Sequence, residues 1–144
     1  MNRFLLLLLM TALNRALWAK TRGGFVTCCC ALFHRASPNV ELANAGHLAP
    51  YLHGSEVALD AGMPLGIVAD LEYAEKTIEV EGGCLTFVSD GVVEAANAKG
   101  ELFGFDRTRE MSTRTAQQIA DAAKAWGQND DITVVTVTRG EVGS

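Results

Sequence analysis

Residues 86–104, TFVSDGVVEAANAKGELFG, constrain this chain more than any other stretch. A run of strand formers ends at Ser89-Asp90-Gly91, and GVVEAAN then has the pattern of one short helical turn. An acidic residue at the end of a buried strand, followed by a glycine that lets ligand or backbone approach, is a common arrangement for holding a metal ion. Asp90 is therefore a candidate metal ligand, and Gly91 is the small residue beside it.

A second acidic stretch lies at residues 129–135, NDDITVV, where Asp130 and Asp131 come directly before a predicted strand over residues 132–138. Here the acidic residues precede the strand, whereas Asp90 follows one. If the two strands are neighbours, their ends bring Asp90 together with Asp130, and Asp131 is the further candidate. The sequence therefore predicts a cluster of carboxylates at one end of a sheet.

The N-terminal segment allows two interpretations. Arg3 followed by FLLLLLM has the charge and length of the start of a secretory signal peptide, but no small-x-small cleavage site follows it. The favoured interpretation is an amphipathic helix over residues 9–20, with residues 1–8 as an atypical apolar lead-in. Its predicted apolar side carries Leu9, Ala12, Leu13, Ala16 and Leu17, and its predicted solvent side carries Asn14, Arg15 and Lys20.

The rest of the chain has the pattern of an α+β fold. Predicted strands cover residues 25–34 and 40–47, which form an antiparallel hairpin, then residues 50–53, 57–59, 73–80 and 85–88. Predicted helices cover residues 106–112 and 115–126. Many antiparallel strands with helices gathered towards the two chain ends indicate α+β rather than a parallel βαβ sheet. A length of 144 residues without a linker predicts one domain.

Charge and cysteine content narrow the functional classes. A net charge of −5 argues against a nucleic-acid surface, and the only long apolar run is too short to span a membrane. Three of the four cysteines are consecutive, Cys28 to Cys30, and no CxxC pair occurs. This pattern favours small buried residues in a reducing compartment, so we expect a cytoplasmic protein. In a strand, Cys28 and Cys30 would share a face.

Taken together, six motifs resemble the PPM-type, or type 2C, metal-dependent protein phosphatases. The closest branch is the bacterial one typified by SpoIIE and RsbU. In order, the motifs are LNRAL at 13–17, GFVT at 24–27, NAGHLAPYL at 44–52, GMPLGI at 62–67, FVSDGVVEAANAKGELFG at 87–104 and NDDITVV at 129–135. The resemblance implies a partial phosphatase domain over residues 9–140 and a tail at residues 141–144.

The resemblance implies two packed antiparallel β-sheets flanked by helices, an α/β/β/α sandwich, with two Mn²⁺ or Mg²⁺ ions. These ions activate a water that attacks phosphoserine or phosphothreonine. Asp90 and Asp130 match metal ligands of the family, with Asp131 and Gly91 as supporting residues. His47 and Gly66 match structural positions. By analogy with the bacterial branch, the expected partner is a phosphoprotein of the anti-sigma-factor antagonist type.

One departure from the family leaves two functions open. The sequence has no GDxxD-like or DVxGHG-like motif, which in the family supply the aspartate that bridges both metals and a carbonyl ligand. The prediction is therefore an N-terminally truncated domain whose second metal site is incomplete and whose uncovered sheet edges favour self-association. The chain is either part of a protein phosphatase or a non-catalytic remnant or protein-binding module.

Overall fold

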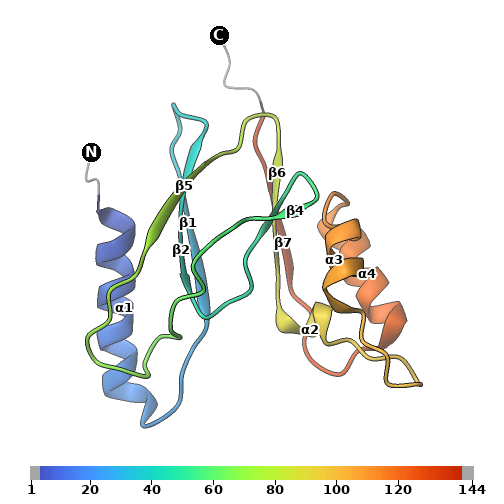
Figure 1. Cartoon of the computed structure of the whole chain (residues 1–144), viewed down its shortest axis with the longest axis horizontal. Coiled ribbons are helices and arrows are strands. Elements are labelled where there is room, and N and C mark those ends of the chain that lie inside the picture. Colours follow the sequence, from blue (N-terminus) through green and yellow to red (C-terminus); the bar gives the residue numbers. More distant parts are fainter. Residues whose placement is uncertain (1–3, 141–144) are drawn as a thin grey trace. The chain divides into compact units, whose positions relative to one another are not determined.

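The computed structural model describes residues 4–140, which fall into two compact units (Figure 1). The first unit comprises the residues up to 49 together with residues 58–79. The second comprises residues 50–57 and the residues from 80 onward. Each unit contains one antiparallel sheet with its own helices. None of the helices in residues 4–140 is long and apolar enough to cross a membrane.

The first unit packs one helix on a three-stranded sheet. Its elements are α1 (Leu5–Thr21), β1 (Cys28–Phe33), β2 (Asn39–Ala45) and β5 (Glu75–Glu79), with strand order β1-β2-β5. The predicted antiparallel hairpin is confirmed, with Cys28 opposite Ala45 and Phe33 opposite Val40. The core between α1 and the sheet consists of Leu6, Met10, Ala43, Ala45, Leu65 and Tyr73.

The predicted orientation of the first helix was right in part: Leu13 and Leu17 pack against the core as expected, but the other three residues of the predicted apolar side do not. The helix begins at Leu5 rather than Leu9, and three residues of the predicted apolar side (Leu9, Ala12 and Ala16) are exposed. The buried side instead carries Leu6, Met10 and Asn14, spaced four residues apart. Asn14 is only 1% exposed, although its polarity predicted the solvent side. It is buried because its amide binds the backbone of a loop far along the chain.

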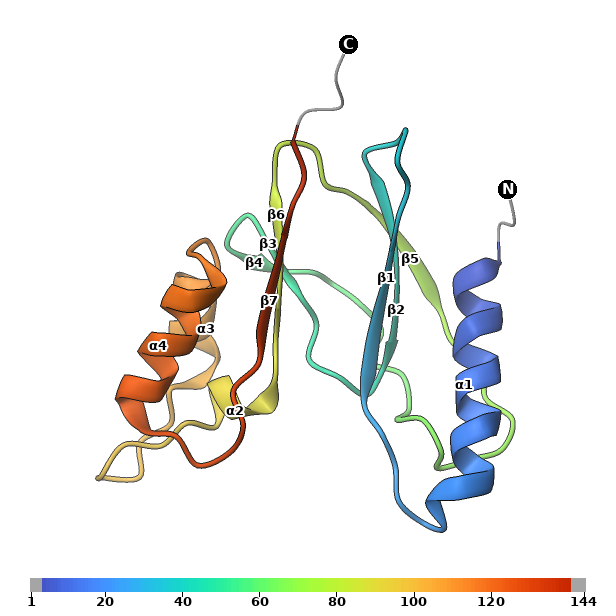
Figure 2. The ribbon, with the colours of Figure 1, turned by 180° about the vertical axis from the view of Figure 1, so that it is seen from behind.

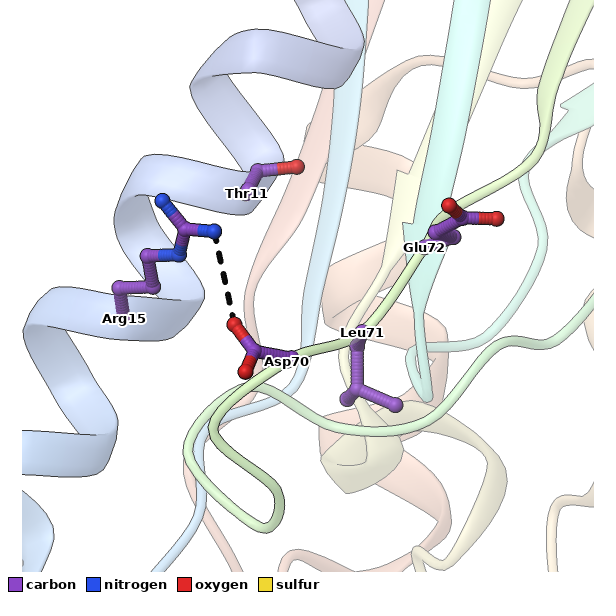
Figure 3. A pocket seen from close by; sticks show the side chains of 5 residues that line it. All are labelled: Thr11, Arg15, Asp70, Leu71 and Glu72. Atoms are coloured by element: carbon purple, nitrogen blue, oxygen red, sulfur yellow. Dashed lines mark hydrogen bonds and ion pairs between the residues drawn. The ribbon is translucent and has the colours of Figure 1, made fainter.

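Two side chains of α1 bind the loop at residues 66–72. Asn14 Nδ2 donates to the carbonyl oxygens of Val68 (2.8 Å) and Ala69 (3.1 Å), and Asn14 Oδ1 accepts from the Gly66 amide (2.9 Å). The neighbouring Arg15 forms a 3.4 Å ion pair with Asp70 across an open hollow (Figure 3). The Arg15 and Asp70 side chains are 67% and 84% exposed, so Asn14 is the stronger attachment.

A carboxyl group in this sheet lies in an unfavourable environment. Glu75 pairs with Ala43 at the start of β5, and its Oε2 atom is buried without a hydrogen bond from the described residues. Burial raises the pKa of Glu75, and the nearby Glu41 carboxylate raises it further. The folded state therefore favours the protonated form of this side chain.

We expect Glu75→Gln to stabilise the first unit at pH 7. Because the folded-state pKa of Glu75 is raised, wild-type stability falls as the pH rises through that pKa, whereas glutamine stays neutral. The advantage should disappear below the ordinary carboxyl pKa of about 4. Urea unfolding at both pH values measures it. Glu79→Gln, an exposed position on the same strand, is the control; a gain by Glu75→Gln that is independent of pH would contradict the explanation.

The second unit contains a four-stranded sheet and three helices. The strands are β3 (Tyr51–Leu52), β4 (Ser55–Glu56), β6 (Cys84–Val88) and β7 (Val134–Thr138), in the order β4-β3-β6-β7. The helices are α2 (Asp90–Val93), α3 (Gly104–Met111) and α4 (Ala116–Gly127). The predicted strand at 57–59 is wrong: the sequence suggested a turn at Gly54 and Ser55, but the chain turns one residue earlier, and the strand lies at Ser55–Glu56. His53 and Gly54 both have positive φ, 51° and 76°, the conformation of a tight hairpin turn.

Helix α4 begins with a capping box in which Thr115 and Gln118 each bind the other's backbone amide. Ile119 and Ala123, four residues apart on one side of the helix, are fully buried. Near its end, the Trp126 ring packs edge-on against Phe103, with ring centroids 6.1 Å apart, and the Arg107 guanidinium lies 4.1 Å from the Trp126 ring centroid. These contacts attach the loop that follows α2 to the two longer helices.

Candidate metal centre

Asp90 is placed by the end of β6. The strand stops at Val88, Ser89 keeps an extended conformation, and Asp90 is the first residue of α2. Because β6 pairs antiparallel with β7, and Val88 lies opposite Val134, the segment before β7 runs alongside the start of α2 (Figure 2). The two acidic stretches of the sequence therefore meet at the same end of one sheet.

Ser89 fixes the two segments to each other. Its amide donates to the Thr133 carbonyl (2.9 Å), and its Oγ accepts from the Thr133 amide (2.9 Å) and donates to the Asp131 carbonyl (3.3 Å). Sequence reasoning missed this residue as a functional position. Serine is common directly before a helix because it caps the helix, but the Ser89 side chain makes no cap hydrogen bond and binds residues 131 and 133 instead, so no local signal identified this role.

Gly91 brings the backbones still closer. A Cβ atom at this position would lie 2.1 Å from the Asp131 carbonyl oxygen and 2.8 Å from its carbon, so a side chain would collide with the backbone. The backbone angles of Gly91 are those of the helix α2, so its role is space and not an unusual conformation. Without a side chain at residue 91, α2 can begin directly against the Asp130-Asp131 segment.

Three carboxylates are exposed around this contact: those of Asp90, Asp130 and Asp131. Asp130 Oδ1 accepts from the Asp131 amide at 2.7 Å, which holds the Asp130 side chain back over its own loop. Carboxylate oxygens are the donors that Mn²⁺ and Mg²⁺ prefer, so the chemistry of the donor set fits such a cation. Their number does not complete a site: within residues 4–140, no group of three or more Asp, Glu, His or Cys side chains could hold a metal ion.

His47 and Gly66 lie in the first unit, where both form hydrogen bonds that involve loop backbone. The His47 amide donates to Asn44 Oδ1 (3.0 Å), Asn44 Nδ2 donates to the His47 carbonyl (2.7 Å), and His47 Nδ1 lies 3.0 Å from the Leu48 carbonyl oxygen. Gly66 has φ +92° and donates its amide to Asn14. The structural roles expected of His47 and Gly66 stay predictions. Asn44, which sequence reasoning did not single out, makes two of these hydrogen bonds.

Solved structures share this fold at low sequence identity. The RsbU and RsbW domains of Rv1364c from Mycobacterium tuberculosis are 19% identical, with a TM-score of 0.70 over 96% of this chain. The SpoIIE phosphatase domain from Bacillus subtilis, presoaked with manganese, is 21% identical, with a TM-score of 0.61 over 95%. The catalytic domain of the phosphatase PstP, in complex with two manganese ions, is 18% identical, with a TM-score of 0.68 over 91%.

These likenesses confirm the predicted fold class, α+β with two antiparallel sheets and accompanying helices. The chain spans 43% of the Rv1364c chain, 66% of the SpoIIE phosphatase domain and 68% of the PstP catalytic domain. No curated protein sequence gives a significant match.

The family itself is shown by the sequence. Residues 6–140 match the family described as Stage II sporulation protein E (SpoIIE). This range contains Asp90, Asp130 and the contacts that Ser89 and Gly91 make with the Asp131 backbone. The chain therefore belongs to the SpoIIE family, a branch of the PPM-type phosphatases.

Proposed function

We propose that this chain takes part in the metal-dependent dephosphorylation of a phosphoserine or phosphothreonine protein, and that Asp90 and Asp130 are its metal ligands. The observation that carries the proposal is the attachment of Ser89 and Gly91 to the Asp131 backbone, because it brings the two acidic stretches to one end of a sheet. Membership of the SpoIIE family supports the reaction type.

Each residue of the proposed site has a distinct task. Asp90 and Asp130 supply anionic oxygens to Mn²⁺ or Mg²⁺, while Ser89 and Gly91 keep their two segments together. Asp131 adds negative charge beside them. A divalent cation bound there supplies a water of lowered pKa and neutralises charge on the phosphoryl group. A full two-ion site also needs carboxylates beyond those that residues 4–140 bring together.

For the partner, we propose a small cytoplasmic phosphoprotein of the anti-sigma-factor antagonist type. The support is the likeness to a structure that contains RsbU and RsbW domains in one chain. A second function is a protein-binding module without hydrolysis, and the shortage of convergent metal ligands in the described residues favours it. The two functions share the fold and differ in whether phosphate is released.

We expect Asp90→Asn to weaken Mn²⁺ binding at least about tenfold and to abolish manganese-dependent phosphate release, because the substitution removes an anionic ligand. Calorimetric titration measures binding. Release is measured from para-nitrophenyl phosphate and from a phosphoserine peptide, with folding checked by circular dichroism. Asp121→Asn is the control, since Asp121 is exposed on α4 and its Oδ1 only accepts from Gln117.

The outcomes separate the two functions. Binding and release that both depend on Asp90 support the phosphatase. If Mn²⁺ binding depends on Asp90 but the folded chain releases no phosphate from either substrate, the result supports the non-catalytic module. Equal Mn²⁺ affinity in the wild type, Asp90→Asn and Asp121→Asn would overturn the assignment of Asp90 as a ligand.

A further inference from the structure

The first unit contains a pair of thiols that the proposed phosphatase site does not use. Cys28 and Cys30 lie two residues apart on β1, and their Sγ atoms are 3.5 Å apart. Both are partly buried against the core beneath α1, and both are free thiols. We propose that Cys28 and Cys30 form a peroxide-reactive dithiol that closes to a reversible intramolecular disulfide.

The two thiols already touch, but closing the bridge requires β1 to bend. Alternate residues of a strand share a face, and a rise of about 3.3 Å per residue separates the Cα atoms of such a pair by about 6.6 Å. That distance is near the upper limit of about 6.8 Å for disulfides. Because side chains on one face of a strand are roughly parallel, the two Cβ atoms are also about 6.6 Å apart, whereas a disulfide needs about 3.5–4.5 Å. β1 must therefore bend locally at Cys29 to form the bond, and the resulting strain makes the disulfide easier to reduce. The bridge is therefore reversible rather than a permanent structural cross-link.

The surroundings distinguish the roles of the thiols. The Cys30 thiol hydrogen-bonds to Cys28 and, with the charge of His47, lowers the pKa of Cys28 below its ordinary range. The same hydrogen bond and burial raise the pKa of Cys30. Burial raises the pKa of Cys29 to about 11. Cys28 is thus the nucleophile, because thiolates react and thiols do not, and Cys30 holds the proton.

The reaction balances with hydrogen peroxide as the oxidant. The Cys28 thiolate attacks one peroxide oxygen, the O–O bond breaks, and hydroxide leaves and takes up a proton as water. The product is a sulfenic acid at Cys28, whose sulfur is oxidised by two electrons. The Cys30 sulfur then attacks the Cys28 sulfur, the S–O bond breaks, and the oxygen leaves as water with the Cys30 proton. In total, two thiols and one peroxide give one disulfide and two waters.

Mass spectrometry of the oxidised full chain tests the proposal. The reduced chain is treated with hydrogen peroxide, remaining thiols are alkylated in denaturant, and the chain is digested with trypsin. Residues 23–35 form one tryptic peptide that contains Cys28, Cys29 and Cys30. We expect this peptide to be two hydrogen atoms lighter, with one alkyl group, on Cys29. Dithiothreitol should restore three alkylation sites.

Cysteine variants identify the partners. Cys29→Ser and Cys84→Ser should keep the bridge, whereas Cys28→Ser and Cys30→Ser should lose it. Circular dichroism checks that each variant is folded, and the alanine variant at the same position replaces any serine variant that is not. A short pulse of iodoacetamide on the unoxidised chain should label Cys28 before Cys29.

Three results would overturn the proposal. The first is a bridge that survives in folded Cys30→Ser, which would show that Cys29 is the partner. The second is a disulfide between two chains, detected on a non-reducing gel. The third is full alkylation of the peptide after peroxide treatment.

Discussion

Replacing Gly91 with alanine should destabilise the second unit by about 3 kcal/mol and remove Asp90-dependent Mn²⁺ binding. The added Cβ would lie 2.1 Å from the Asp131 carbonyl oxygen, so the two segments must move apart by about 1 Å or more to reach ordinary contact. The movement would also stretch the bond from Ser89 Oγ to the same carbonyl. Helix propensity acts in the opposite direction, because alanine is favoured over glycine by about 1 kcal/mol. The sign of the change therefore distinguishes the two effects.

Urea unfolding and Mn²⁺ titration of Gly91→Ala measure the two effects. Gly140→Ala is the matched control, since a Cβ at residue 140 meets nothing within 4 Å. Stability equal to or above the wild type in Gly91→Ala would mean that the segments are not held in close contact. Normal stability with lost Mn²⁺ binding would mean that they separate at little cost.

Replacing Asn14 with leucine should destabilise the first unit by about 3 kcal/mol, although a leucine fits the apolar surroundings of Leu6 and Met10. Three buried or partly buried backbone groups of the 66–69 loop lose their partner: the Gly66 amide and two carbonyl oxygens. Leaving such groups unsatisfied costs about 1–3 kcal/mol each, and access of water to the outer carbonyls reduces the sum. Asn14→Asp should be at least as damaging, because a carboxylate cannot donate to those carbonyls.

The neighbouring Arg15 provides the contrast for this test. Arg15→Ala breaks the exposed ion pair with Asp70 and should cost less than about 1 kcal/mol. Thermal and urea unfolding of the three variants give the comparison. If Arg15→Ala and Asn14→Leu were equally stable, the buried amide would not be what attaches the loop to α1.

Local patterns in the sequence predicted much of this fold. The β1–β2 hairpin, β6, β7, α3 and α4 were expected within a few residues of their observed bounds, because hydrophobic periodicity and turn residues act over short distances. The ends of short elements were less predictable. The turn at His53 requires a positive φ from a non-glycine residue, whereas glycine adopts it freely, so a turn centred on Gly54 and Ser55 was the better expectation from sequence.

In the candidate site too, local sequence predicted some residues and missed others. Asp90 and Asp130 could be picked out because each acid borders a strand, and the motifs around them suggested the family. Nothing local marks Ser89 as the residue that bonds to position 131, because its partners are 42 and 44 residues away. Asn14 is the clearest failure: the helical pattern assigns a polar residue to solvent, and the three groups that it satisfies lie 52–55 residues later.

By itself, the sequence determined the family, the order of strands and helices, and the acidic residues that border β6 and β7. Tertiary structure decided which side of α1 is buried, how closely Gly91 approaches Asp131, and that the thiols of Cys28 and Cys30 meet beneath α1. The physical reason is range. Periodicity and turn propensity depend on residues a few positions apart, whereas burial, close backbone contact and the reactivity of a thiol depend on strand register and on groups brought together from distant parts of the chain.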